Sequence, residues 1–326
     1  MSRLADLAGG LADRVAGRLV SGLSLDDALA TADDLLAQGL RVSLARMAPD
    51  PDGSPDDAAW SRYRESALPE ASRALAALQG AGAGSRGGVL IAADPVDALR
   101  AAGRQWPGSL TSGRSALRVV AEQAQDAAIP LVLGEGSDAS VPATLELVDQ
   151  FRREGLSVGM TLAAMRRRSE ADCASIEAPV RLVKGDARLR RDPQVERFRA
   201  GLEVDKSFIR CVKARVRAGL PVCVATHDAR LLQIVQAIVA RHRCPAGLVE
   251  YAFVLGRGQR MQARIHDSGG VVRIRIPYGP QWQASLQHAL AGPARVMAAG
   301  RLASAPLPAD VADRSREDLR ARRSRG

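Results

Sequence analysis

The chain has few aromatic residues, cysteines and histidines, and each shortage removes support for a class of site. Aromatic residues make up 3% of the 326 residues, so nothing resembles the aromatic and basic side chains interleaved in single-strand nucleic-acid grooves. The four cysteines form no Cys-x-x-Cys pair and the four histidines no His-x-x-x-His spacing, so no metal site is predicted. Cysteines within apolar segments are typical of reduced core thiols in a cytoplasmic protein.

Lysine is also scarce, although the formal charge is +10. Lysine and arginine total 46, and the lysines are only Lys184, Lys206 and Lys213. Arginine with alanine and glycine at the expense of lysine is typical of a GC-rich genome, so the charge alone gives little support to nucleic-acid binding. We do not expect a nucleic-acid partner.

No apolar run is long enough to cross a bilayer, and Asp6 and Asp13 interrupt the amino-terminal segment where a secretory signal would lie. These observations predict a soluble, cytoplasmic protein.

Short apolar runs rich in β-branched residues alternate with helical patterns along the chain. Most of the runs are continuous, as expected for strands buried on both faces. The predicted strands are 40–44, 88–92, 130–133, 157–162, 180–184, 221–226, 247–255 and 271–276. Helical spacing of apolar residues predicts helices over 143–154, 195–218 and 228–241. Eight such alternations predict an α/β fold, a (β/α)8 TIM-type barrel with N-terminal helices, and a doubly wound sheet is the alternative.

Three segments differ in composition. Residues 1–38 are predicted to form an N-terminal helical arm, which serves either as a cap or as an oligomer contact, and residues 39–300 the barrel domain. Residues 301–326 are rich in arginine and are predicted to be a disordered tail. That tail is the one place where polyanions would bind non-specifically.

Cationic or protonatable residues lie at three of the predicted strand exits. They are Lys184, His227 and Arg275. In a parallel barrel the carboxyl ends of all strands meet at one rim, so these side chains predict a site for an anionic ligand. Asp228 is predicted to cap the following helix and to leave backbone N–H groups near His227. By strand alternation, Arg275 is predicted to face the lumen.

Four motifs in order resemble the proline dehydrogenases, which are FAD-dependent barrel enzymes. They are Arg-Leu-Val-Lys-Gly at 181–185, Ala-Thr-His-Asp at 225–228, Glu-Tyr-Ala-Phe-Val-Leu-Gly at 250–256 and Val-Arg-Ile-Arg-Ile-Pro-Tyr-Gly-Pro-Gln-Trp at 272–282. The similarity runs roughly over 84–300. The resemblance implies a flavoprotein that oxidises proline or a related amino or imino acid.

The resemblance also implies cofactor-binding roles for several residues. Arg181 would approach the flavin or its phosphates, Lys184 and Gly185 would line the cofactor, and Thr226 and His227 would contact FAD. Arg168 also matches the family pattern and is a further candidate cofactor-binding residue. Fixed cations suit both the pyrophosphate and a reduced flavin.

Several positions depart from the family pattern, chiefly those that recognise proline. Ala163 and Ala252 replace glutamines, and Arg275 replaces a tyrosine. The paired arginines that hold the proline carboxylate align with His288 and Ala289, and the strand-3 aspartate aligns with Gly134, next to Glu135. Glu135, Arg275 and His288 are therefore the candidate catalytic residues.

Three functions remain open at this point. The first is an FAD-dependent oxidoreductase acting on the CH–NH group of proline or a related acid, with an electron acceptor that the sequence does not identify. The second is a non-catalytic or repurposed barrel of the same lineage, and the third is a basic nucleic-acid-associated protein.

Overall fold

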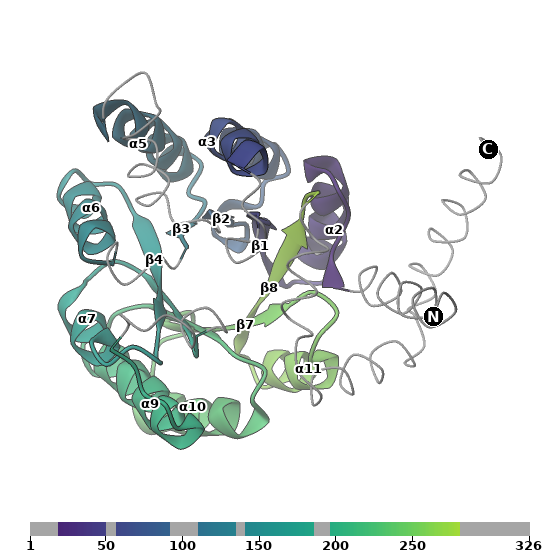
Figure 1. Cartoon of the computed structure of the whole chain (residues 1–326). Helices are drawn as coiled ribbons and strands as arrows, with labels where there is room; N and C mark the ends of the chain where they lie inside the picture. The colour runs from purple at the N-terminus through teal and green to yellow at the C-terminus, as the bar shows by residue number, and fades with distance from the viewer. Residues whose placement is uncertain (1–18, 50–56, 92–109, 135–140, 186–195, 281–326) are drawn as a thin grey trace, which may run out of the picture. The chain divides into compact units, whose positions relative to one another are not determined.

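The computed structural model describes residues 19–49, 57–91, 110–134, 141–185 and 196–280. These residues belong to one compact unit that spans residues 17–285. The unit is built on eight parallel strands, each hydrogen-bonded to the next, and β8 pairs with β1 to close a barrel (Figure 1). The strands are β1 (Arg41–Arg46), β2 (Val89–Ile91), β3 (Leu131–Leu133), β4 (Val158–Ala163), β5 (Val180–Val183), β6 (Val222–Ala225), β7 (Val249–Val254) and β8 (Val271–Tyr278).

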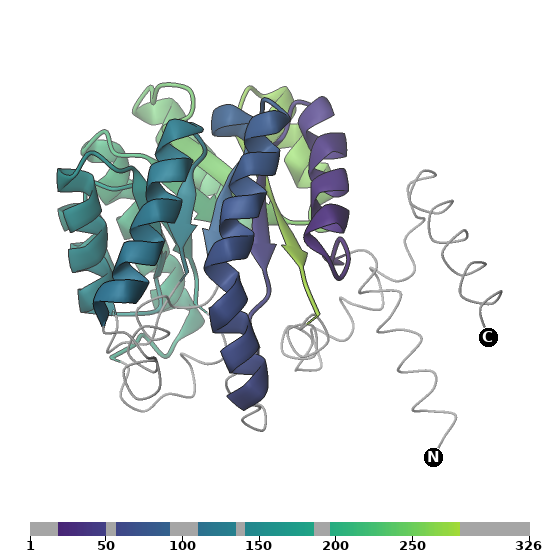
Figure 2. The same ribbon diagram turned by 90° about the horizontal axis from the view of Figure 1, so that it is seen from above.

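Helices cover the outer side of the strands, where α2, α3 and α5 run next to one another (Figure 2). The helices are α2 (Leu25–Ala37), α3 (Asp57–Gly80), the 3-10 helix η1 (Gly84–Arg86), α5 (Leu110–Asp126), α6 (Val141–Arg153), α7 (Ser169–Ser175), α9 (Gly201–Arg217), α10 (Ala229–Arg241) and α11 (Gln259–Asp267). None of these described helices is both long and apolar enough to cross a membrane.

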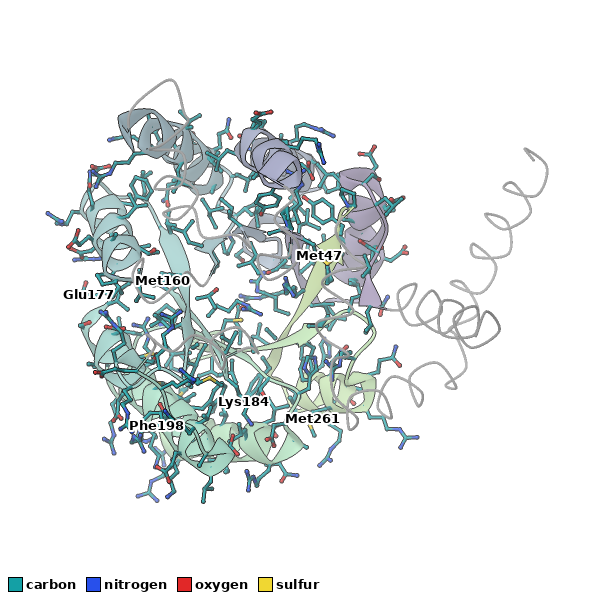
Figure 3. All side chains as sticks on the ribbon, viewed as in Figure 1. Met47, Met160, Glu177, Lys184, Phe198 and Met261 are labelled. Carbon is teal, nitrogen blue, oxygen red and sulfur yellow. The ribbon has the colours of Figure 1, made fainter. Side chains whose placement is uncertain are left out.

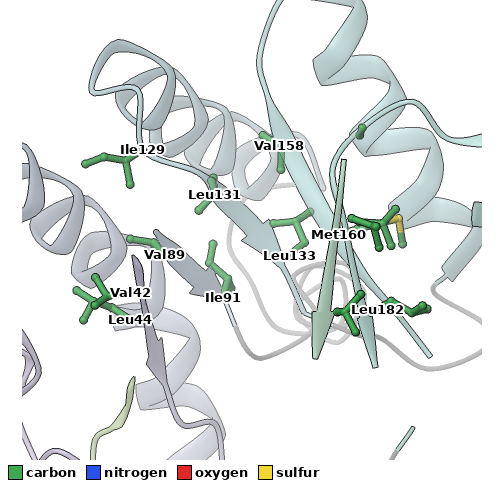
Figure 4. Close-up of a cluster of buried hydrophobic side chains, with 14 of the residues drawn as sticks. Val42, Leu44, Val89, Ile91, Ile129, Leu131, Leu133, Val158, Met160 and Leu182 are labelled. Atoms are coloured by element: carbon green, nitrogen blue, oxygen red, sulfur yellow. The ribbon is translucent and has the colours of Figure 1, made fainter. Parts of the chain in front are cut away.

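The hydrophobic core lies between the strands and the helices. Alternate strand residues such as Val42, Leu44, Leu131 and Leu133 point outward into it and are almost fully buried (Figure 4). The intervening residues therefore face the barrel lumen. In β4 and β5, for example, the odd-numbered residues face the lumen, and a site in the lumen would use their side chains.

The closed sheet confirms the predicted barrel and excludes the doubly wound alternative. Each predicted strand lies within about two residues of an observed one. The helices predicted over 143–154 and 228–241 match α6 and α10, while α9 begins at Gly201, later than the predicted 195.

Helix α2 is the described part of the predicted N-terminal arm. It packs against β1 and β8. Ser24 caps it, since the Ser24 hydroxyl accepts from the N–H of Asp27 while the Asp27 carboxylate accepts from the N–H of Ser24. The chain before it also joins the barrel, because the N–H of Ser21 donates to the carbonyl of Pro277. An oligomer contact through residues 1–38 stays a prediction, and the tail at 301–326 lies outside the described residues.

Candidate functional site

The candidate site extends from the middle of the lumen, where Arg181 of β5 and Arg275 of β8 project, to its carboxyl-terminal end, where His227 follows β6. Arg181 projects inward from β5, in register with Thr161 of β4 and Cys223 of β6. His227 follows β6, and Arg275 projects from β8. The charge of Arg181 acts on both His227 and Arg275, so the three side chains form one electrostatic group.

Arg275 faces the lumen, as the strand alternation predicted. It lines the lumen cavity together with Arg181 and Ala252. It lies within β8, three residues before Tyr278, and not at the strand exit as predicted. Burial, and then the charge of Arg181, lower the pKa of Arg275 to about 10. Within the described part of the chain, its buried Nε has no hydrogen-bond partner.

His227 is a neutral imidazole, which corrects its grouping with the cations. Burial, followed by the charges of Arg257 and Arg181, lowers the pKa of His227 to about 4. Its Nε2 accepts a hydrogen bond of 3.1 Å from the N–H of Val254. The ring also meets Phe253 edge-on, with centroids 5.7 Å apart. Since Nε2 is an acceptor, the remaining proton is on Nδ1, which is therefore a donor.

Lys184 is held between two carboxylates on the side of α9 and α10. Its Nζ lies 2.5 Å from Asp205 of α9 and 3.3 Å from Asp228. Figure 3 labels Lys184 on the barrel. By strand alternation, Lys184 faces away from the lumen that Arg181 enters. Asp228 is the N-cap of α10, as predicted, and accepts from the N–H groups of Arg230 and Leu231. The ammonium of Lys184 is thus engaged in a structural ion pair, and its contact with a cofactor stays a prediction.

The remaining predicted cofactor residues have structural partners of their own. Arg168 precedes α7 and donates to both oxygens of Asp172, at 2.7 and 3.1 Å. Thr226 is buried, and its Oγ1 accepts from the N–H of Asp228 at 3.2 Å. Gly185 has a φ of 110°, a left-handed backbone that favours glycine directly after β5.

Two candidate catalytic residues, Glu135 and His288, lie outside the described residues. Among the residues that are described, no group of histidine, cysteine and acidic side chains has the arrangement of a metal site.

One polar group in the lumen was not predicted. Glu250 of β7 accepts from Nε of Arg273 at 2.5 Å and also pairs with Arg41. Arg273 further donates to the carbonyls of Val42 and Gly87, at 2.7 and 2.9 Å. These residues lie one strand repeat below Ala252 and Arg275. Glu250 and Arg273 lie two residues before Ala252 and Arg275 on the same strands. The inward and outward alternation of strand residues could therefore have predicted that both face the lumen.

The described residues fit a polar, anionic group at this end of the lumen. Thr161 is buried and, among the described residues, its Oγ1 has no hydrogen-bond partner. The buried Nε of Arg275 likewise has no partner among the described residues, and Nδ1 of His227 is a donor. Of the residues that replace family glutamines, Ala252 lines the lumen cavity, while Ala163 is buried and packs with Met165 and Val204.

Sequence comparisons support the resemblance that the motifs indicated. The chain is 32% identical over 158 residues to the proline dehydrogenase of Deinococcus radiodurans. The match covers 46% of this chain and 49% of that protein. It is 27% identical over 142 residues to proline dehydrogenase 1 of Bacillus subtilis subsp. natto, covering 43% of this chain and 46% of that protein. No protein-family model matches the chain. The chain is thus similar in sequence to the proline dehydrogenases, and the matched segment spans about half the length of these curated proteins.

Solved structures share the barrel fold. Proline utilization A from Bdellovibrio bacteriovorus, inactivated by N-propargylglycine, matches 87% of this chain and 32% of its own, with a TM-score of 0.70 and 17% identity. Proline utilization A from Bradyrhizobium japonicum matches 83% of this chain and 30% of its own, with a TM-score of 0.62 and 14% identity. At these identities the likeness concerns the fold alone.

Proposed function

We propose that the chain is a proline-dehydrogenase-like flavoprotein that oxidises the C–N bond of proline or a related amino or imino acid in the cytoplasm. The observation that carries the proposal is the convergence of Arg181, His227 and Arg275 within the lumen, where the charge of Arg181 acts on the other two. The sequence relatives support the same reading. An unidentified electron acceptor would complete the turnover.

Arg181, His227 and Thr161 would hold the cofactor FAD. A guanidinium suits the negative charge that a reduced flavin or its pyrophosphate carries, and a neutral imidazole adds an N–H donor without adding charge. When bound, FAD supplies an acceptor for the hydride on the carbon next to the substrate nitrogen. Lys184, Gly185, Thr226 and Arg168 would support this site from the rim.

Arg275 would bind the substrate carboxylate. Arg275 is half-buried, and its buried Nε has no hydrogen-bond partner in the described part of the chain. Carboxylates pair with guanidinium forks in a bidentate way. Orienting the substrate from its carboxylate would fix the carbon that reacts. Glu135 and His288 remain candidate catalytic residues, and of these two only His288 aligns with the arginines that hold the proline carboxylate.

An absorbance spectrum of the purified protein tests the proposal. We expect a yellow protein with a flavin spectrum that bleaches when proline or a related acid is added without oxygen. N-propargylglycine, which inactivates the Bdellovibrio relative, is expected to change the spectrum irreversibly. A colourless protein that does not take up added FAD would overturn the proposal, and a yellow protein that no amino or imino acid bleaches would support a non-catalytic barrel.

Two variants test whether Arg181 contributes to FAD binding. Arg181→Met is expected to weaken FAD retention at least about tenfold, because a charge-assisted hydrogen bond is lost. The matched control is Arg217→Met on the exposed end of α9, where the same change removes a charge away from the lumen. Equal FAD retention in both variants would contradict the assignment of Arg181.

A further inference from the structure

The barrel contains a cavity of about 400 Å³ that is lined by Arg181 and Arg275 of the candidate site and continues toward the amino-terminal ends of the strands. Barrels of this class normally fill the lumen with layers of bulky side chains. Here small residues occupy inward positions on four different strands, namely Ser43, Gly159, Cys223 and Ala252. The volume falls in the range of small-molecule sites.

The cavity reaches solvent at the amino-terminal end of the strands. Its lining includes Gln125, Ala128, Ser157 and Pro221, which precede β3, β4 and β6 and are exposed. This mouth is opposite the carboxyl-terminal rim where catalysis is proposed.

The cavity carries an excess of positive charge on an otherwise apolar wall. Its charged lining residues are Arg181, Arg273, Arg275 and Glu250. Glu250 is already engaged by Arg273 and by Arg41. Arg275 has no ion-pair partner among the described residues, and its Nε is buried without a hydrogen bond. A buried guanidinium without a counter-charge is unfavourable unless an anion joins it.

We propose that this lumen cavity binds a monocarboxylate with an apolar body of several carbons, admitted from the amino-terminal mouth. The carboxylate pairs with Arg275. The body lies among the apolar lower lining, which includes Leu90, Ile129 and Val132. The site needs no flavin and does not rest on the proposed function. Because Arg275 is shared, a ligand bound from below would compete with a substrate carboxylate bound from above.

Calorimetric titration of the purified full chain with octanoate tests the site, with octanol as the uncharged probe. We expect saturable one-to-one binding of octanoate and binding at least about tenfold weaker for octanol, because the charged group is lost. Arg275→Met should weaken octanoate binding to a similar extent. Ser157→Trp, which places a bulky ring at the mouth, should also weaken it, while Ala174→Trp on the exposed surface of α7 should not.

Cys223 reports where the ligand lies, because it lines the same cavity. Octanoate is expected to slow the modification of Cys223 by a small uncharged methanethiosulfonate reagent, followed by mass spectrometry of the Cys223 peptide, while Cys244 reacts unchanged. This measurement uses the unaltered protein, so it stands if Arg275→Met does not fold.

The proposal is overturned if octanoate shows no saturable binding, if octanol binds as tightly, or if Ser157→Trp and Cys223 protection show no effect. A colourless protein that passes these tests leaves the cavity site intact while the flavoprotein proposal fails. A yellow protein that is bleached by substrate but fails these tests would support the flavoprotein proposal and refute the cavity site.

Discussion

The Nε2 atom of His227 accepts a hydrogen bond from the backbone N–H of Val254 across 3.1 Å, which joins the loop after β6 to the last residue of β7. The bond requires an unprotonated Nε2. It is consistent with the low pKa of His227, since protonation would place two donors face to face in a buried position.

Acid should therefore destabilise the fold through His227. Its pKa is about 4 in the folded protein, below the ordinary value of 6.5, so the unfolded chain binds the proton first. The free energy of unfolding is expected to fall as pH drops from about 6.5 to about 4, by up to about 3 kcal/mol from this group, and to level off below. Urea unfolding at pH 7, 6 and 5 measures it.

The control for this prediction is His227→Gln, whose amide oxygen can still accept from the N–H of Val254 but does not titrate. The variant should lose less stability than the parent over the same pH range. Identical pH dependence of the two proteins would show that His227 contributes nothing to it.

Glu250 should be a strong determinant of stability. Burial alone would raise the pKa of Glu250, but the guanidiniums of Arg273 and Arg41 outweigh this and hold the pKa below its usual range. Its carboxylate is therefore charged, and its side chain is only 15% exposed. Glu250→Gln would leave two guanidiniums without a counter-charge, at an expected cost of about 2–4 kcal/mol in urea unfolding.

Glu203→Gln is the matched control for Glu250→Gln. Glu203 pairs with Lys206 at 2.9 Å, but both side chains are about half exposed, at 43% and 54%. Solvent screens such a pair, so little change is expected. A loss at Glu250 no larger than that at Glu203 would refute the structural role of the lumen ion pair.

The strands could be predicted from the sequence because a parallel barrel strand is buried on both faces and leaves a continuous apolar run. Arg181 and Arg275 could be placed in the lumen because alternation within a strand is local. The partners of Lys184 could not be predicted, since Asp205 reaches it from α9 through the packing of the helix. The hollow lumen was also unpredictable, because it depends on the register that sets Ser43, Cys223 and Ala252 around one space.

Arg215 should be essential to the fold, although it lies far from the proposed chemistry. It is fully buried and donates to the carbonyls of Ala178 and Pro221, at 2.8 and 2.9 Å, and also to that of Ile176. Arg215→Leu would remove the donor to the carbonyls of Ala178 and Ile176, while that of Pro221 keeps the N–H of Val180, at an expected cost of about 3–5 kcal/mol. Thermal and urea unfolding would measure it. Arg217→Leu, two residues on and exposed, should have little effect, and equal losses would contradict the role of Arg215.

Gly159 is expected to tolerate no side chain, because β4 approaches the chain before β5 closely at this point. A Cβ at Gly159 would lie 2.7 Å from the carbonyl oxygen of Pro179, a backbone atom that cannot move aside alone. Gly159→Ala should therefore cost about 1–3 kcal/mol in urea unfolding, by the same overpacking that penalises added methylenes in a core. Gly201→Ala is the matched control: a Cβ there meets nothing within 4 Å, and alanine favours the first turn of α9. That variant should be neutral or slightly more stable. Equal stability of Gly159→Ala and Gly201→Ala would contradict the close approach of Gly159 to the carbonyl oxygen of Pro179.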